Sequence, residues 1–203
     1  LDLEEGDEVI TADFTFAATV EVIHLLKLKA VLVDVDYDTF TISPDRIRQA
    51  ITPKTKAIIP VHLFGQCANM EEILKIAKEH NLFVIEDNAQ AIGAEYTFND
   101  GRVKKSGTMG TMGTTSFFPS KNLGCYGDGG AIFTDDDDLA HRLRGIVNHG
   151  MYERYYHDEV GVNSRLDSIQ AAVLRKKLPH LNAYNEARSK AANYYNEAFS
   201  NHP

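Results

Sequence analysis

The chain has 203 residues, 43% of them hydrophobic and 25% charged, which is ordinary for a globular protein and long enough to bury one substantial core. Asp and Glu number 29 against 21 Lys and Arg, and the resulting net charge of −8 argues against nucleic acid or an anionic membrane as a partner. No apolar run reaches the length of a membrane span, and the start of the chain is acidic where a signal peptide is basic, so we expect a cytoplasmic protein.

Short apolar runs alternate with helical segments through the first half of the chain. The runs are typical of parallel strands buried on both faces, and they lie at residues 8–10, 30–33, 57–61 and 82–85. Helical periodicity occupies residues 17–27, 44–50 and 69–79, with Ser43 as a cap and Pro44 at the first position of the second helix. This βαβα order predicts an α/β fold with a doubly wound, mostly parallel central sheet and helices on both faces.

A basic stretch and a glycine run follow. Residues 102–105 place Arg and Lys beside Gly and Asn, which favours a solvated loop over a phosphate-binding patch. The glycines within residues 107–113 raise the hypothesis of a dinucleotide-binding module. Because they do not join a first strand to a helix, they are interpreted as a loop.

The second half of the chain predicts a hairpin and then helices. Strands are expected at residues 114–118 and 131–134, joined by a glycine-rich turn. The aspartates at 135–138 precede a periodic segment at 139–147 and suit a helix N-terminus better than a calcium site, whose spacing they lack.

A long helix is expected from residue 166 onward, kinked or restarted at Pro179. We therefore divide the chain into a large domain, residues 1–165, and a helical segment, residues 166–203, that leads to a C-terminal subdomain outside this chain. The chain is expected to be a fragment that lacks material at both ends.

Cysteine and histidine spacing predicts neither a disulfide framework nor a metal site. Cys67 and Cys125 lie far apart without a Cys-x-x-Cys pair, and the eight histidines lack the spacing of metal ligands.

Two residues stand where a reaction could take place. Asp87 ends a predicted strand, and ligands of open α/β sheets bind at the carboxyl ends of strands, although a carboxylate there can also simply cap the strand. Lys121 follows another strand and precedes a glycine-rich turn. A partly desolvated lysine amine loses its proton readily and can then form an imine, whereas the alternative is a surface lysine in a turn.

Together these residues fit one cofactor, pyridoxal phosphate, which needs an amine for its aldehyde, an acid for its ring nitrogen and donors for its phosphate. Lys121 would form the Schiff base, Asp87 would keep the ring nitrogen protonated, and Ser116 would bind the phosphate. Gln90, three residues after Asp87, would hold the phenolic oxygen of the ring.

Several motifs occur in the order found in a known family. They are Glu86-Asp87-x-Ala89-Gln90 and residues 116–124 and 161–167, with further matches at 6–10, 14–19, 55–62 and 170–172. Over essentially its whole length the chain resembles the DegT/DnrJ/EryC1/StrS family of sugar aminotransferases. The resemblance implies a fold-type-I architecture, a homodimer with active sites at the subunit interface, and transfer of an amino group, usually from glutamate, to a nucleotide-linked keto-sugar in amino-sugar and polysaccharide biosynthesis.

The resemblance also assigns residues by position. It supports the roles of Lys121, Asp87, Gln90 and Ser116 and makes residues 1–165 the domain that binds pyridoxal phosphate. Phe16 looks like the aromatic residue that stacks on one face of the cofactor ring, with Ala89 on the other face. Asn163 looks like the residue that reaches the phosphate in the neighbouring subunit, although the Asn163-Ser164 pair would also serve as a helix N-cap.

The family's Gly/Thr phosphate-binding loop would lie upstream of this chain and its substrate subdomain downstream. Family members that carry histidine in place of the lysine act as dehydratases, and Lys121 argues against that activity.

Within the family, residues 124–130, 154–157 and 161–165 look most like enzymes that aminate C3 of a UDP-linked 3-keto-N-acetylglucosaminuronate. Arg165 would then pair with the substrate carboxylate, or it would tie the start of the long helix to the domain. A protein of the same fold that binds the cofactor and acts as a regulator is the alternative function.

Overall fold

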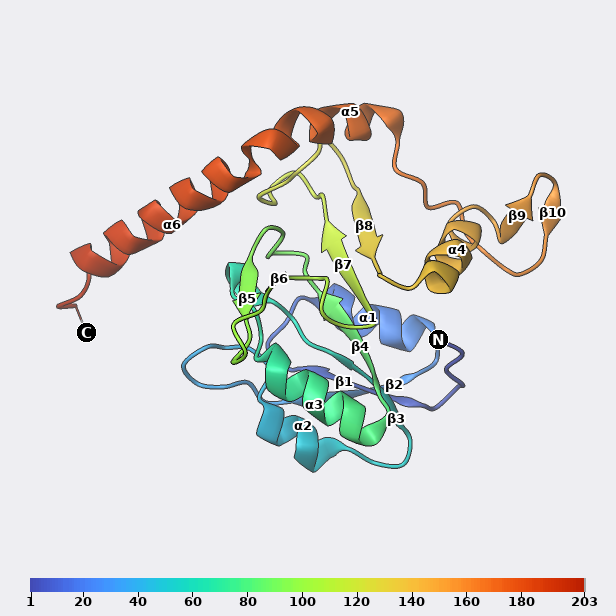
Figure 1. Cartoon of the computed structure of the whole chain (residues 1–203), viewed down its shortest axis with the longest axis horizontal. Coiled ribbons are helices and arrows are strands. Elements are labelled where there is room, and N and C mark those ends of the chain that lie inside the picture. The colour runs from blue at the N-terminus through green and yellow to red at the C-terminus, as the bar shows by residue number, and fades with distance from the viewer. Residues whose placement is uncertain (203) are drawn as a thin grey trace.

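A computed structural model describes residues 1–202. Its centre is a six-stranded sheet in the order β2-β1-β3-β4-β7-β8 (Figure 1). All neighbouring strands are parallel except β7 and β8, which form the predicted antiparallel hairpin. The strands are β1 (Glu8–Ala12), β2 (Lys29–Val33), β3 (Thr55–Ile59), β4 (Phe83–Asp87), β7 (Met112–Ser116) and β8 (Gly130–Phe133).

Helices cover both faces of this sheet, as the alternating pattern predicts. Val9 and Ile10 are adjacent on β1 and point to opposite faces, because side chains alternate along a strand. Val9 packs in one apolar cluster with Ile23 of α1 (Ala17–Leu25). Ile10 packs in another cluster with α2 (Pro44–Ala50) and α3 (Met70–His80), which lie side by side in Figure 1. The predicted α/β architecture is confirmed.

Helix ends follow the predicted chemistry with one exception. Asp136 is the N-cap of α4 (Asp137–Ile146), and its carboxylate accepts from the backbone N–H of Leu139 at 2.9 Å, which explains the run of aspartates. Ser43 occupies the N-cap position of α2, but its side chain makes no capping hydrogen bond. The start of α2 therefore depends on Pro44, whose fixed φ suits the first helical position.

The last part of the chain is a helix interrupted at the predicted place. It consists of α5 (Ser168–Lys177), the 3₁₀ turn η2 (Leu178–His180) and α6 (Leu181–Ala198). Pro179 lies inside η2, where the lack of a backbone N–H costs the tighter turn little. In Figure 1, α6 runs away from the sheet. Within residues 1–202, no helix has the length and apolar character to cross a membrane.

Two small hairpins were not expected. One joins β5 (Glu95–Thr97) to β6 (Val103–Lys105), so the prediction that residues 102–105 are loop was wrong for 103–105. The other joins β9 (Met151–Glu153) to β10 (Tyr156–His157). The β6 strand is exposed throughout and lacks an apolar alternation, so periodicity gives no signal for it.

Residues 107–111 of the glycine run form a loop, whereas Met112 and Gly113 already belong to β7, so the loop prediction was wrong for these two residues. The loop wraps a buried carboxylate of β4. Glu86 is fully buried. Its Oε1 accepts from the backbone N–H groups of Met109 at 2.5 Å and Gly110 at 2.6 Å, and its Oε2 accepts from the backbone N–H of Gly107 at 2.7 Å. A Cβ at Gly110 would lie 2.6 Å from the carbonyl oxygen of Val84, so only glycine lets the loop approach this closely.

His62 completes the set of donors around Glu86. It is fully buried, and its Nε2 lies 2.8 Å from Glu86 Oε2. Its Nδ1 accepts from the backbone N–H of Ala68, which leaves the ring hydrogen on Nε2, facing the carboxylate. Burial by itself raises the pKa of Glu86, but hydrogen bonds from His62, Gly110 and Met109 outweigh burial and hold that pKa below its ordinary value.

We predict that Glu86→Gln lowers the free energy of unfolding by about 3 kcal/mol at pH 7, because either amide orientation sets an NH₂ group against two N–H donors. Urea unfolding measures this loss. The exposed pair of Glu5 with Lys27 provides the control, and Glu5→Gln should unfold like the parent.

The same variant has a defined pH dependence. Since folding lowers the pKa of Glu86, its contribution to stability is present at neutral pH and is lost as the pH falls below about 4.3, the ordinary value for glutamate. The gap between parent and Glu86→Gln should therefore shrink between pH 5 and about pH 3.5. A gap that stays constant over this range would contradict the assignment.

Candidate active site

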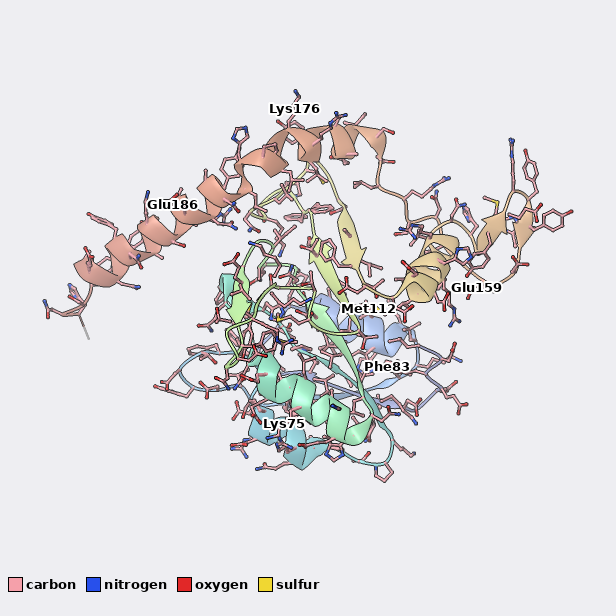
Figure 2. The ribbon with its side chains drawn as sticks, viewed as in Figure 1. Lys75, Phe83, Met112, Glu159, Lys176 and Glu186 are labelled. Carbon is pink, nitrogen blue, oxygen red and sulfur yellow. The ribbon has the colours of Figure 1, made fainter. Side chains whose placement is uncertain are left out.

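Three of the predicted site residues lie at, or just beyond, the carboxyl ends of three parallel strands. Asp87 ends β4 and Ser116 ends β7, and Asp87 stands opposite Thr114 in the register of these strands. Phe16, the N-cap of α1, follows the end of β1. Figure 2 labels Phe83 and Met112, the first residues of β4 and β7, so the site lies at the opposite ends of those strands. This is the edge where open α/β sheets bind ligands.

The carboxylate of Asp87 is fixed from two sides. Its Oδ1 accepts from the backbone N–H of Ala89 at 3.1 Å, a local turn bond of the kind that caps a strand end. Its Oδ2 lies 2.7 Å from the hydroxyl of Thr19, a buried residue in the first turn of α1. That hydroxyl also lies 2.9 Å from the hydroxyl of Thr15. Because a carboxylate only accepts, Thr19 donates to Asp87 and accepts from Thr15.

Thr19 is a site residue that sequence reasoning missed. The segment 14–19 belongs to the motifs of the family resemblance, but nothing in its pattern gives Thr19 a role. Its partner Asp87 lies 68 residues away in sequence, so only the fold brings the two side chains together.

Gln90 is oriented by a backbone contact. Its side-chain Oε1 accepts from the backbone N–H of Phe64 at 3.0 Å. Phe64 lies in the 3₁₀ turn η1 (Leu63–Gly65) with a left-handed φ of 56°, and its ring is exposed. Since the oxygen of the amide is engaged, the nitrogen of Gln90 remains as a donor.

Lys121 and Gln90 line one cleft. Lys121 is half-buried in the turn after β7, where its backbone N–H donates to the carbonyl of Phe118 at 2.9 Å. The cleft has a volume of about 650 Å³ and is also lined by Phe64 and by Arg188 of α6. The residues that line it include no aspartate or glutamate, so the cleft favours an anionic ligand.

Asn163 and Arg165 line a different, larger cavity of about 1040 Å³ beside β8 and α4. Arg165 Nε donates to Asn163 Oδ1 at 3.0 Å, and Arg165 Nη1 donates to Asn148 Oδ1 at 3.3 Å. Arg165 thus ties the segment before α5 to Asn148, the second residue after the end of α4, as one of its two predicted roles requires. The N-cap of α5 is Asp167, so the hypothesis that Asn163 and Ser164 cap this helix was wrong.

The remaining predicted residues differ in exposure. Phe16 is 75% exposed, a large apolar ring left in solvent next to the first turn of α1. Ala89 and Ser116 are half-buried. The Ser116 oxygen accepts from the backbone N–H of Phe118 at 3.2 Å, which leaves the hydroxyl hydrogen free to donate.

Comparison with known sequences gives a family match over the full length. The sequence model of the DegT/DnrJ/EryC1/StrS aminotransferase family matches residues 1–203. The chain is 55% identical to a "Pleiotropic regulatory protein" of Geobacillus stearothermophilus, over 94% of this chain and 50% of that protein. It is 52% identical to a UDP-2-acetamido-2-deoxy-3-oxo-D-glucuronate aminotransferase of Pseudomonas aeruginosa, over 94% of this chain and 52% of that protein.

Solved structures agree with this match. DesV of S. venezuelae, crystallised in complex with a ketimine intermediate, superimposes with a TM-score of 0.92 at 43% identity. The superposition covers 98% of this chain and 52% of DesV. The chain therefore spans about half the length of the curated relatives and of the solved structure that it matches.

Proposed function

Because this chain belongs to the DegT/DnrJ/EryC1/StrS aminotransferase family, we propose that it binds pyridoxal phosphate and serves the transfer of an amino group from glutamate to a nucleotide-linked keto-sugar. The observation that carries the proposal is the Asp87 carboxylate, held by Thr19 at the sheet edge from which the Lys121 turn also emerges. The chain spans half of its relatives, so the activity of the whole protein is part of the proposal.

The side chains present fit this cofactor. Asp87 offers an anion with both oxygens already oriented, which suits a protonated ring nitrogen. Gln90 offers an amide N–H for the phenolic oxygen, because Phe64 engages the amide oxygen. Ser116 offers a hydroxyl hydrogen for a phosphate oxygen.

The two faces of the ring would be covered by Phe16 and Ala89. An exposed phenyl ring at the start of α1 is available for stacking, and such contacts contribute about 1 kcal/mol beyond buried area. Ala89 follows Asp87 by two residues, and its small side chain leaves room for a ring against the opposite face.

Each residue then has a defined chemical task. Pyridoxal phosphate supplies a sink for the electron pair left when an amino acid loses its Cα proton. Asp87 would hold the proton on the ring nitrogen and so keep the ring cationic. Lys121 would hold the cofactor through Nζ, and its free amine would serve as the base that moves the Cα proton.

We propose a UDP-linked 3-keto-uronic acid as the sugar. The support is the 52% identity to the Pseudomonas aeruginosa aminotransferase that is named for such a substrate. Arg165 would bind the substrate carboxylate through Nη2, the guanidinium nitrogen that Asn163 and Asn148 leave free.

A cofactor-binding regulator is the second candidate, favoured by the 55% identity to the "Pleiotropic regulatory protein". Since Lys121 and Asp87 are both present in this chain, catalysis remains the first proposal. A cytoplasmic location and the division at residue 165 remain predictions.

We further propose a homodimer with shared sites, in which Asn163 of one subunit binds the phosphate of the cofactor held by Lys121 of the other. The support is that Asn163 and Lys121 line separate cavities of one chain. An amide that serves the cofactor from that position has to come from a second copy.

The first prediction of this proposal is that borohydride fixes the cofactor on Lys121. Peptide mapping of the reduced protein should find the label there, and Lys121→Ala should lose the visible absorbance band. Lys176→Ala, an exposed lysine of α5 that points away from the sheet in Figure 2, should keep the band. A label on a different lysine would overturn the proposal.

The second prediction concerns Asp87→Asn. In the parent, added glutamate should remove the absorbance band, which a regulator that only binds the cofactor would not do. Asp87→Asn should still bind cofactor but react by orders of magnitude more slowly in single-turnover measurements, because an amide does not hold the ring proton. Asp45→Asn on α2 is the control. A rate within about tenfold of the parent, or roughly 1.4 kcal/mol, would reduce Asp87 to a strand-end cap.

The third prediction tests the shared site by mixing inactive chains. Lys121→Ala combined with Asn163→Ala should regain roughly a quarter of the parental activity, because random reassortment makes half of the dimers mixed, each with one intact site. Lys121→Ala combined with Asp87→Asn should regain none, since both residues serve the same subunit's cofactor. If subunits exchange and the first mixture stays inactive, Asn163 serves its own chain.

A further inference from the structure

The turn that carries Lys121 is irregular and needs support from elsewhere in the chain. Residues 117–129, between β7 and β8, contain neither helix nor strand. Four of its five internal hydrogen bonds involve Phe117 or Cys125. The fifth is the bond from the backbone N–H of Lys121 to the carbonyl of Phe118. A lysine at such a place keeps a fixed position only if the surrounding structure holds the turn.

The long helix provides that support through three hydrogen bonds. Gln170 Oε1 accepts from the backbone N–H of Tyr126 at 2.8 Å. Lys177 Nζ donates to the carbonyl of Gly124 at 2.6 Å. Asn185 Oδ1 accepts from Asn122 Nδ2 at 2.8 Å. These helix residues are seven and eight positions apart, about two turns each, so they form one line that faces the turn.

Apolar packing fills the spaces between these bonds. Leu174 and Leu181 of the helix are buried in one cluster with Phe117, Leu123 and Cys125 of the turn. The turn is therefore attached to the helix by its own hydrophobic core as well as by the three bonds.

The bond nearest to Lys121 joins three parts of the site. Asn122 Nδ2 donates to the carbonyl of Ile92 at 3.0 Å as well as to Asn185, so both of its hydrogens are engaged. Asn185 Nδ2 donates to the same carbonyl at 3.2 Å. Ile92 follows Gln90 by two residues. A Cβ at Gly93 would lie 2.9 Å from Asn185 Nδ2, so the absence of a side chain at Gly93 leaves room for the Asn185 amide.

We propose that Asn185 is a positioning residue for Lys121. It acts through Asn122, whose fixed side chain sets the backbone of the turn and hence the direction of the neighbouring amine. The orientation of α6 is thereby coupled to the reactive lysine. This inference rests on the proposed role of Lys121 as the cofactor lysine.

The test measures the covalent reaction of Lys121 with pyridoxal phosphate separately from the binding of the cofactor. It uses apoprotein produced from the full-length gene. Pyridoxal phosphate reports the rate at which Lys121 reacts, through the growth of the absorbance band. 4-Deoxypyridoxine phosphate has no aldehyde and reports binding alone. In Asn185→Ala, capture should slow by about tenfold or more, because a misplaced reacting group loses rate steeply. Affinity for the deoxy analogue should stay within about twofold of the parent, because Asp87, Gln90 and Ser116, the residues proposed to bind its ring and phosphate, are unchanged.

Asn193→Ala is the matched control, the same substitution on an exposed face of α6, and should capture at the parental rate. Should Asn185→Ala fail to fold, Asn122→Ala removes the same bond from the other side and should slow capture equally. Parental capture in either folded variant would overturn the inference, as would an equal loss of affinity for the analogue, which marks a general structural role. If the parent itself does not react with pyridoxal phosphate at Lys121, the proposed function is wrong, and the inference about Asn185 is then wrong as well.

Discussion

Two consecutive carboxylates end β4, and the alternation of side chains along a strand sends them to opposite faces of the sheet. Glu86 enters the interior, where an unpaired charge would be very unfavourable, and three backbone N–H groups and His62 surround it. Asp87 is left at the sheet edge, fixed by Thr19. The buried carboxylate of Glu86 needs a loop of small residues close to β4. This requirement accounts for the glycines of the loop, which resemble a nucleotide-binding motif in the sequence. The anion at the edge remains available to a ligand.

The sequence predicted the elements of the fold wherever their buried residues recur with a regular spacing. Strands β1 to β4 appear as apolar runs, and Pro179 marks the break in the long helix because its missing N–H acts locally. The hairpin of β5 and β6 left no such trace, since three exposed residues with cross-strand charge pairing look like any polar loop. The cap of α5 was misplaced by four residues, from Asn163 to Asp167, because several polar residues before a helix offer equivalent caps.

The sequence predicted only some of the residues at the candidate site, for a different reason. Asp87 and Lys121 stand at strand ends, which the pattern locates, and the chemical needs of the cofactor suggest Gln90 and Ser116. The residues that hold them come from far along the chain: Thr19 is 68 positions from Asp87, and Asn185 is 63 positions from Asn122. Side-chain hydrogen bonds of that kind have no periodicity and no spacing, so one sequence gives no signal for them until the fold is known.

Regular and irregular elements of the fold position different residues of the site. Asp87 belongs to a strand, and the sheet fixes its position. Lys121 sits in a turn where only one of the five internal hydrogen bonds is its own. A residue that reacts with a cofactor has to be placed within a fraction of an ångström. Rigidity at that turn is supplied by α5 and α6, through the buried cluster and the three side chains that face it. Because α6 extends away from the sheet, the proposed role of Asn185 would couple a displacement of this helix to the lysine turn. Asp87, in contrast, is held by its own strand and by Thr19 of α1. The acid and the amine of the site are therefore held by different parts of the fold, the acid by β4 and α1 and the amine by the turn that α5 and α6 support.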